Sequence, residues 1–187
     1  MNKTMSLSID FPINVGNDIL LNELDASMSE SLFHLVDRNR SHLREFLGWL
    51  DHNTSLDDSL KFIETELTKH QSLEGLTLGI YVDKNLVGLV SLYGIDRINH
   101  CTSIGYWISQ DMQGKGIMSR SVRKLIDLAF NHLNLHRIEI RCAVKNYKSQ
   151  KVAEQLGFKR EGVLKESIFH YGNYFDAYLY GLIKTRV

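Results

Sequence analysis

The most informative stretch of this sequence is Gln113-Gly-Lys-Gly-Ile-Met118. It follows a strand-like run, Thr102–Ile108, and precedes Ser119–Leu133, where apolar residues recur at the i, i+3, i+4 spacing of an amphipathic helix. A second strand-like run, Arg137–Val144, comes next. A strand, a helix and a strand in this order predict two parallel strands joined by a right-handed crossover helix.

The loop itself is predicted to bind an anion, because it lies at a helix N-terminus. The first N–H groups of a helix have no acceptor within the helix, and the helix dipole adds partial positive charge. Gly114 and Gly116 have no Cβ, so the backbone can approach a phosphate closely. Lys115 and Arg120 are candidates to add charge, and solvated side chains are the alternative. These features predict a cradle for a diphosphate; a tight turn without a ligand is the alternative.

Two other phosphate-binding motifs do not fit this loop. A Walker motif requires Ser or Thr after the lysine, whereas Gly116 follows Lys115. A dinucleotide fingerprint requires a third glycine where Ser119 stands. It also requires an acidic residue after the next strand, where the chain has Lys145 and Asn146. The loop therefore indicates neither a Walker-type nucleotide site nor a nicotinamide site.

The remaining segments predict a single α/β domain over residues 1–187. The expected helices are Ser27–Arg38, Ser41–Leu50, Leu56–Gln71 and Ser149–Leu156, and the further strands are Asp18–Glu23, Thr77–Val82, Leu86–Tyr93, Lys159–Phe169 and Tyr174–Ile183. Ser27-Met-Ser-Glu30 has the pattern of a capping box. This order of segments predicts a mixed sheet flanked by helices.

Composition excludes several classes of protein. Lys and Arg total 22, matched by 22 Asp and Glu, so a general nucleic-acid or anionic-membrane binder is not expected. Cys101 and Cys142 are two thiols in strand-like runs, which does not indicate a disulfide framework. The N-terminal residues have no signal-peptide pattern, and no run approaches the ~20 apolar residues that span a bilayer. We expect a soluble, cytoplasmic protein.

The loop resembles the Arg/Gln-x-x-Gly-x-Gly/Ala pyrophosphate motif of the GNAT superfamily of N-acetyltransferases. Further blocks occur in the family's order and spacing: Ile104-Gly-Tyr-Trp-Ile108, Asn146-Tyr-Lys-Ser149 and Leu156-Gly-Phe158. With Asn39-Arg40 and Trp49, they look most like the RimJ/RimL group, which acetylates N-termini of ribosomal proteins. The resemblance covers nearly the whole chain. It implies a GNAT-like three-layer domain with a mixed, mostly antiparallel central sheet flanked by helices.

The resemblance also implies direct transfer from acetyl-CoA to an amine while both are bound, and it implies site residues by position. The residues expected at acetyl-CoA are Tyr106, Trp107, Ile108, Gln113, Gly114, Lys115, Gly116, Ile117, Met118, Ser119, Asn146 and Ser149. The acceptor is expected beside Asn39, Arg40 and Trp49. Core packing is the alternative for the aromatic residues, and a solvated helix face is the alternative for the basic stretch around Arg40. A homodimer is implied by the family alone.

Two departures from the family pattern affect the expected roles. Ala153 stands where many members carry a tyrosine thought to protonate the departing thiolate. Ser149 resembles the serine that the RimL group uses instead, so we assign it as thiolate donor; a helix cap is the alternative. Met118 replaces a small residue at the end of the motif, so its side chain is expected to point away from the coenzyme.

The general base is the least defined element. Many relatives carry a glutamate at the position of Ser103. Glu166 is the first candidate here, followed by Asp176 and His170, and a solvated strand residue is the alternative for each. An α-amine with a pKa near 7.7–8.0 is roughly a tenth neutral at pH 7, whereas a lysine amine near 10.4 is neutral in about one molecule in 2,500. The lack of an obvious base therefore favours an N-terminal amine as acceptor.

Two other functions fit the same motifs. The chain could acetylate a small amine such as a polyamine or an aminoglycoside, which an acidic acceptor cleft would support. It could also bind coenzyme A as a sensor without turnover. No metal site is predicted, because His132 and His136 have no Cys or acidic partner that completes a zinc set.

Overall fold

The computed structural model describes residues 9–16 and 18–185. Most of the N-terminal segment, in which no signal peptide was expected, lies outside these residues. The strands are β1 (Ile13–Asn14), β2 (Ile19–Glu23), β3 (Gly75–Val82), β4 (Asn85–Asp96), β5 (Cys101–Ile108), β6 (Arg137–Ala143), β7 (Lys159–His170) and β8 (Asn173–Ile183). The α-helices are α1 (Ser29–Arg38), α2 (Arg40–Leu43), α3 (Leu56–Gln71), α4 (Ile117–Asp127) and α5 (Tyr147–Gln155). Shorter helical turns are η1 (Ala26–Met28), η2 (Leu50–His52), η3 (Gln110–Met112) and the π-helical η4 (Leu128–His132).

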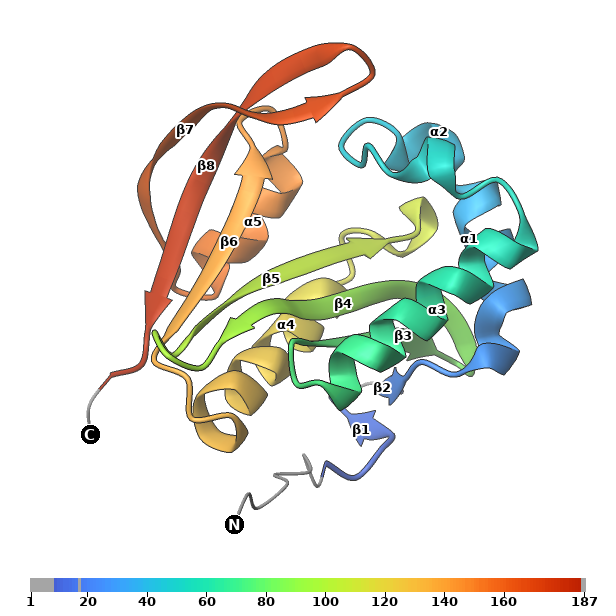
Figure 1. The fold of residues 1–187 in the computed structure, drawn as a ribbon, viewed down its shortest axis with the longest axis horizontal. Helices are drawn as coiled ribbons and strands as arrows, with labels where there is room; N and C mark the ends of the chain where they lie inside the picture. Colours follow the sequence, from blue (N-terminus) through green and yellow to red (C-terminus); the bar gives the residue numbers. More distant parts are fainter. Residues whose placement is uncertain (1–8, 17, 186–187) are drawn as a thin grey trace.

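The strands of the described residues form one sheet in the order β1-β2-β3-β4-β5-β6-β8-β7. Neighbouring strands are antiparallel except β5 and β6, which pair in parallel across the crossover helix α4. The predicted parallel pair and the mixed, mostly antiparallel sheet are therefore confirmed (Figure 1).

Helices cover both faces of the sheet, and each face has its own apolar core. On β3, the alternating residues Leu76, Leu78 and Ile80 pack in the core that includes α4. Residues of α1 and α3 build the second core on the opposite face, with Leu89 of β4 and the partly buried Tyr81 of β3. This division follows from the period of two in a strand, which sends successive side chains to opposite faces. The sheet is the middle of three layers (Figure 1).

The strands β5 and β6 separate soon after they begin. In the described residues their parallel ladder joins Cys101–Ser103 to Arg137–Glu139 and extends no further. Beyond it the two strands splay apart in Figure 1, with α5 on the β6 side of the gap. The far half of β5 therefore has no strand partner along the edge that faces β6, and its backbone is available there to another molecule.

The helical region before the sheet departs from the prediction. The predicted helix Ser41–Leu50 is wrong: α2 ends at Leu43, and the chain then turns into η2. The tip of the β7–β8 hairpin contacts this segment, and tertiary contacts can override local helix propensity. The Tyr171 hydroxyl donates to the Leu47 carbonyl at 3.1 Å, and a Cβ added to Gly48 would lie 2.7 Å from the His170 Cβ.

Two smaller local predictions are also corrected. The helical cap at this point is Asp25, whose carboxylate accepts the Ser27 N–H at 2.7 Å, so the predicted capping box at Ser27 is wrong. Strand β1 was not predicted, because a two-residue strand has no periodic signal. The predicted crossover helix exists, but it begins at Ile117 and continues from Leu128 as the π-helical η4.

Candidate active site

The loop before α4 has the geometry of an anion cradle. Gly114 and Gly116 have φ values of +74° and +71°, and a Cβ added to either would meet no atom within 4 Å. Gly116 is the cap of α4, and the first bond from this cap runs from the Arg120 N–H to the Gly116 carbonyl at 3.2 Å. The residues between Gly116 and Arg120 are Ile117, Met118 and Ser119, in the first turn of α4. Their N–H groups have no acceptor within the helix. The backbone here fits a diphosphate.

This loop opens into a cleft of about 800 Å³, a size suited to a cofactor-sized molecule. The cleft lies between the end of β5, the loop, α5 and the segment from α2 to Leu47. It is lined by every residue expected at acetyl-CoA except Lys115. The Lys115 side chain is exposed and lies with its Nζ 3.5 Å from Met112 Sδ. Met118 also lines the cleft, but its side chain is buried in the core beneath the loop.

The backbone of β5 presents one N–H group to the cleft at the end of the strand. The Ser109 N–H donates to the Val87 carbonyl of β4 at 2.8 Å. Because N–H groups alternate in direction along an extended chain, the Ile108 N–H faces the opposite edge, toward the gap beside β6. The side chains alternate as well: Tyr106 packs against the core on the α4 side, and Trp107 packs against the core on the α1 side.

Positive charge gathers on the α5 wall of the cleft, where Lys145, Lys148 and Lys151 all line it. Lys148 Nζ donates to Gln113 Oε1 at 2.6 Å, and Gln113 Nε2 donates to His42 Nε2 at 2.6 Å. The pKa of His42 lies below its usual value because of burial and the nearby Lys148 ammonium, so the neutral ring can accept. Sequence reasoning missed both His42 and Lys148. No motif contains His42. Lys148 lies inside the block Asn146–Ser149, in which only Asn146 and Ser149 were given roles.

The start of α5 settles which residue caps this helix. The Asn146 amide oxygen accepts the Ser149 N–H at 3.1 Å, so Asn146 is the cap. Ser149 is the third residue of the helix, and its hydroxyl lies 3.0 Å from the Tyr106 hydroxyl instead. Ser149 Oγ thus points across the gap toward β5, in the wall of the cleft.

A sequence model of the acetyltransferase (GNAT) domain matches residues 18–159. The chain belongs to the GNAT family. It is 30% identical over 171 residues to the ribosomal-protein-serine acetyltransferase of Escherichia coli (strain K12), an alignment that covers 91% of this chain and 96% of that protein.

Solved structures agree with this membership. The microcin C7 self-immunity acetyltransferase MccE, in complex with acetyl-CoA and AMP, matches with a TM-score of 0.89 and 30% identity, covering 96% of this chain and 99% of that one. RimL, a ribosomal L7/L12 α-N-protein acetyltransferase in complex with coenzyme A, matches with a TM-score of 0.89 and 30% identity, covering 92% and 97%. The GNAT-like fold is therefore confirmed, and this protein is an acetyl-CoA-dependent N-acetyltransferase.

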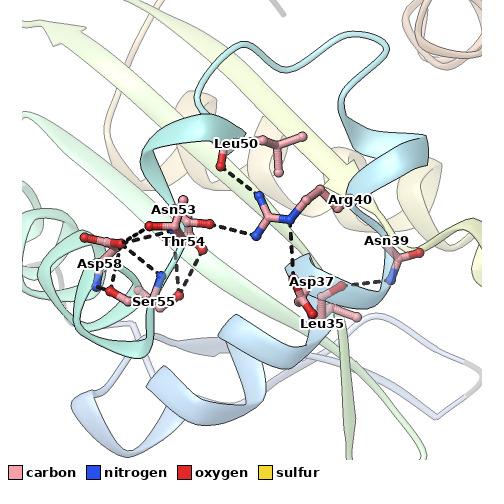
Figure 2. A network of polar contacts seen from close by, with 10 residues as sticks. Leu35, Asp37, Asn39, Arg40, Leu50, Asn53, Thr54, Ser55 and Asp58 are labelled. Carbon is pink, nitrogen blue, oxygen red and sulfur yellow. Dashed lines mark hydrogen bonds and ion pairs between the residues drawn. The ribbon is translucent and has the colours of Figure 1, made fainter.

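In this acetyltransferase the structure places Asn39 and Arg40 in contacts within the protein. Asn39 Nδ2 donates to the Leu35 carbonyl at 2.9 Å, and its Oδ1 accepts the Gln110 N–H at 2.9 Å. The Arg40 guanidinium donates to the carbonyls of Leu50 and Asn53 at 2.9 and 2.8 Å (Figure 2). Neither residue lines the cleft of the described structure. Both residues hold α2 in place. Asn39 does so through η3, the segment just before the loop that precedes α4.

Trp49 lies behind the aromatic wall of the cleft. Its ring centroid is 6.2 Å from that of Trp107, which lines the cleft, and Trp49 itself is 38% exposed. Among the described residues, Trp49 is not part of the cleft lining. Its contact with acceptor therefore stays a prediction.

The three candidate bases are not among the described residues that line the cleft. The Glu166 N–H donates to Asp176 at 2.9 Å, and the Lys165 ammonium bonds the same carboxyl and lowers its pKa. His170 is buried, with its ring stacked on Phe175 at 4.6 Å between centroids. Neither these carboxylates nor His170 belongs to the lining, in which Glu45 is the one acidic residue of the described chain. Glu45 follows α2, a segment that shows no catalytic motif.

Two features are absent from the part of the chain that the structure describes. No group of three His, Cys, Asp or Glu side chains there is arranged to hold a metal ion. None of the helices there combines the length and apolar character that a bilayer crossing requires.

Proposed function

We propose that this acetyltransferase modifies the N-terminal α-amine of a protein, with a ribosomal protein as its physiological acceptor. The E. coli relative is named a ribosomal-protein-serine acetyltransferase, and RimL is named a ribosomal L7/L12 α-N-protein acetyltransferase. Both match more than nine-tenths of this chain. The proposal places the enzyme in the cytoplasm, where ribosomal proteins are made.

The charge of the cleft carries this choice of acceptor. Three lysines and the neutral His42 line the described cleft, against the single carboxylate of Glu45. A polyamine or an aminoglycoside is a polycation, and several carboxylates would be needed to attract it. One carboxylate matches one ammonium group, as found at a protein N-terminus. The cleft therefore favours a singly charged amine over the small polycationic acceptors.

In this proposal each wall of the cleft has its own task. The N–H groups at the start of α4 and the lysines of α5 bind the phosphates of acetyl-CoA. The Ile108 N–H is the donor for the thioester carbonyl oxygen, and Ser149 Oγ is the donor for the sulfur. When bound, acetyl-CoA supplies an activated carbonyl carbon: a C–N bond to the amine forms there, and the C–S bond breaks with its electron pair going to sulfur.

The acceptor enters, in this proposal, along the wall formed by the α2 segment. Glu45 attracts the ammonium form of the acceptor, and Phe46 and Leu47 supply apolar surface beside it. An α-amine at pH 7 is about a tenth neutral without any help. After the neutral amine attacks the carbonyl carbon, its nitrogen loses one proton to water or to Glu45. The proposal therefore requires no strongly basic residue.

The test is an acceptor screen that follows release of free coenzyme A thiol. The panel contains a peptide with a free N-terminal serine and an internal lysine, the same peptide with a blocked N-terminus, spermidine and kanamycin. We expect turnover only with the free N-terminus, and mass spectrometry should place the acetyl group on the α-amine. Acetylation of the blocked peptide at lysine, or of spermidine alone, would overturn the choice of acceptor. Coenzyme binding without turnover on any amine would instead support a sensor.

A further inference from the structure

A tyrosine of the central sheet reaches across the gap between β5 and β6 to the proposed thiolate donor. The Tyr106 hydroxyl lies 3.1 Å from the main-chain oxygen of Ser149 and 3.0 Å from its Oγ. Tyr106 comes from β5 and Ser149 from α5, 43 residues later. Both side chains line the cleft. The contact therefore joins the two walls that separate where the sheet opens.

Besides Tyr106, the Ser149 hydroxyl has one side-chain neighbour within hydrogen-bonding reach, the Cys142 thiol, and it does not cap the helix. Asn146 caps α5 through the Ser149 N–H, so Oγ is not the helix cap. The neighbouring thiol of Cys142 is buried, which raises its pKa to about 11, so it stays protonated near neutral pH. Ser149 Oγ is thus held among neutral groups, with Tyr106 as its partner from β5.

The phenol has one proton and two acceptors at Ser149. When Tyr106 donates to the main-chain oxygen, the serine hydroxyl can donate to the phenol oxygen. When the serine hydroxyl turns toward a sulfur in the cleft, the phenol can donate to Oγ. The two arrangements differ only by rotation of hydroxyl groups, and each keeps Oγ in place.

We propose that Tyr106 is a positioning residue that holds Ser149 Oγ and strengthens its hydrogen bond to the departing sulfur. This inference rests on the proposed function, in which Ser149 is the donor to sulfur. A hydroxyl that accepts one hydrogen bond becomes a better donor in the next, because bonds in a chain polarise one another. On α5, Ala153 stands at the position where many members of the family carry a tyrosine. In this chain Tyr106 therefore supplies a phenol from β5 instead.

The pair stabilises the thiolate without giving up a proton. Burial raises the pKa of Tyr106 above its ordinary value, so the phenol stays neutral and remains a donor. The electron pair of the broken C–S bond stays on sulfur, and coenzyme A leaves as a thiolate that takes its proton from water. Neither side chain becomes charged in the wall of the cleft, where charge would be poorly solvated.

The test is a titration of bound coenzyme A, followed by the ultraviolet absorbance of its thiolate. We expect Tyr106→Phe and Ser149→Ala each to lower the thiolate fraction at pH 7.5 by about fivefold, the effect of one hydrogen bond of about 1 kcal/mol. The double variant should match Ser149→Ala alone, because Tyr106 acts through Ser149. The matched control is Tyr178→Phe, a partly buried tyrosine of β8 outside the described cleft lining.

Each outcome decides a separate question. The absorbance is normalised to the coenzyme bound, measured by calorimetry, so a destabilised variant still reports on the thiolate. An unchanged titration of Tyr106→Phe, or a double variant whose effect is the product of the single effects, would overturn the inference. A wild-type enzyme that turns over no amine, yet shows the expected titrations, would overturn the proposed function and leave the contact between Tyr106 and Ser149 intact.

Discussion

The two halves of the cleft are built in different ways. The proposed coenzyme half depends mainly on backbone N–H groups from one six-residue loop and from the free edge of β5, with side chains of the α5 wall beside them. The proposed acceptor half consists of side chains from the α2 segment, which the β7–β8 hairpin contacts. The bond from Tyr171 to Leu47 joins residues 124 positions apart. A site made of local backbone is visible in a short motif, whereas a site made of distant side chains is not.

The difference also affects what a substitution does. Backbone donors are lost only when the course of the main chain changes or a new side chain fills the space before them. Side chains on the acceptor wall can change one by one, and the fold then keeps its coenzyme site. We therefore expect substitutions to separate coenzyme affinity from acceptor affinity, in the order of effect that follows.

The largest effect is expected from Gly116→Val. Valine at a φ of +71° is strained, and its side chain would fill the space in front of the N–H groups. Losing two charge-assisted hydrogen bonds removes about 3 kcal/mol or more, so calorimetry should show the Kd for acetyl-CoA rising about 100-fold or more. Gly172→Val is the matched control, with a φ of +75° in the β7–β8 turn and coenzyme affinity unchanged. Equal binding by both variants would contradict the loop assignment.

The next effect is expected from Arg40→Met. This change leaves the carbonyls of Leu50 and Asn53 without their donor, so urea denaturation should show the free energy of unfolding lowered by about 1–3 kcal/mol. Because Arg40 braces the acceptor side, the KM for the peptide should rise while the Kd for acetyl-CoA stays within about twofold. The control is Arg97→Met in the exposed turn before β5. A large rise in peptide KM without any loss of stability would instead show that Arg40 contacts the acceptor directly.

A smaller effect is expected from Glu45→Gln. It removes the carboxylate of the cleft lining that we propose attracts the acceptor ammonium, so the peptide KM should rise about fivefold, the effect of about 1 kcal/mol for an exposed ion pair. The KM for acetyl-CoA should not change. Glu64→Gln on the exposed face of α3 is the control. Glu166→Gln, measured in parallel, tests the carboxylate that the sequence suggested; a fall in kcat there alone would return the base to β7.

The smallest effect is expected from Asp58→Asn, at the start of α3. Hydrogen bonds from Ser55 and Thr54 hold the pKa of Asp58 below its unfolded value. The resulting stability is complete above the unfolded pKa, near 3.9, and is lost as pH falls through the lower folded pKa. The Tm of wild type should therefore exceed that of the variant at pH 7, and the difference should shrink below about pH 4. A difference in Tm that is the same at pH 3 and pH 7 would contradict an electrostatic origin.

Elements with a strong local pattern were predicted correctly, whereas a segment that a distant hairpin contacts was not. Strong periodicity located α3 and the crossover helix, and the strand–helix–strand order predicted the parallel pair of β5 and β6. The predicted helix at Ser41–Leu50 failed because its helical pattern is local, whereas the hairpin that bends it lies more than 100 residues away in the chain. Glu166 was chosen by its place near the last strands; it does not line the cleft of the described residues, and its role as base stays a prediction.

The sequence by itself determined the parallel strand–helix–strand unit and the family, and it predicted the anion cradle, because glycine positions and apolar periods act over a few residues. Only the tertiary structure decided which side chains meet around the cleft. Tyr106 contacts Ser149, and Gln113 contacts both His42 and Lys148. The tertiary structure also placed Glu45 in the cleft lining. The physical reason is that these residues are far apart in the sequence. The separation of β5 from β6 and the fold of the hairpin bring them together, and no local sequence pattern encodes either feature.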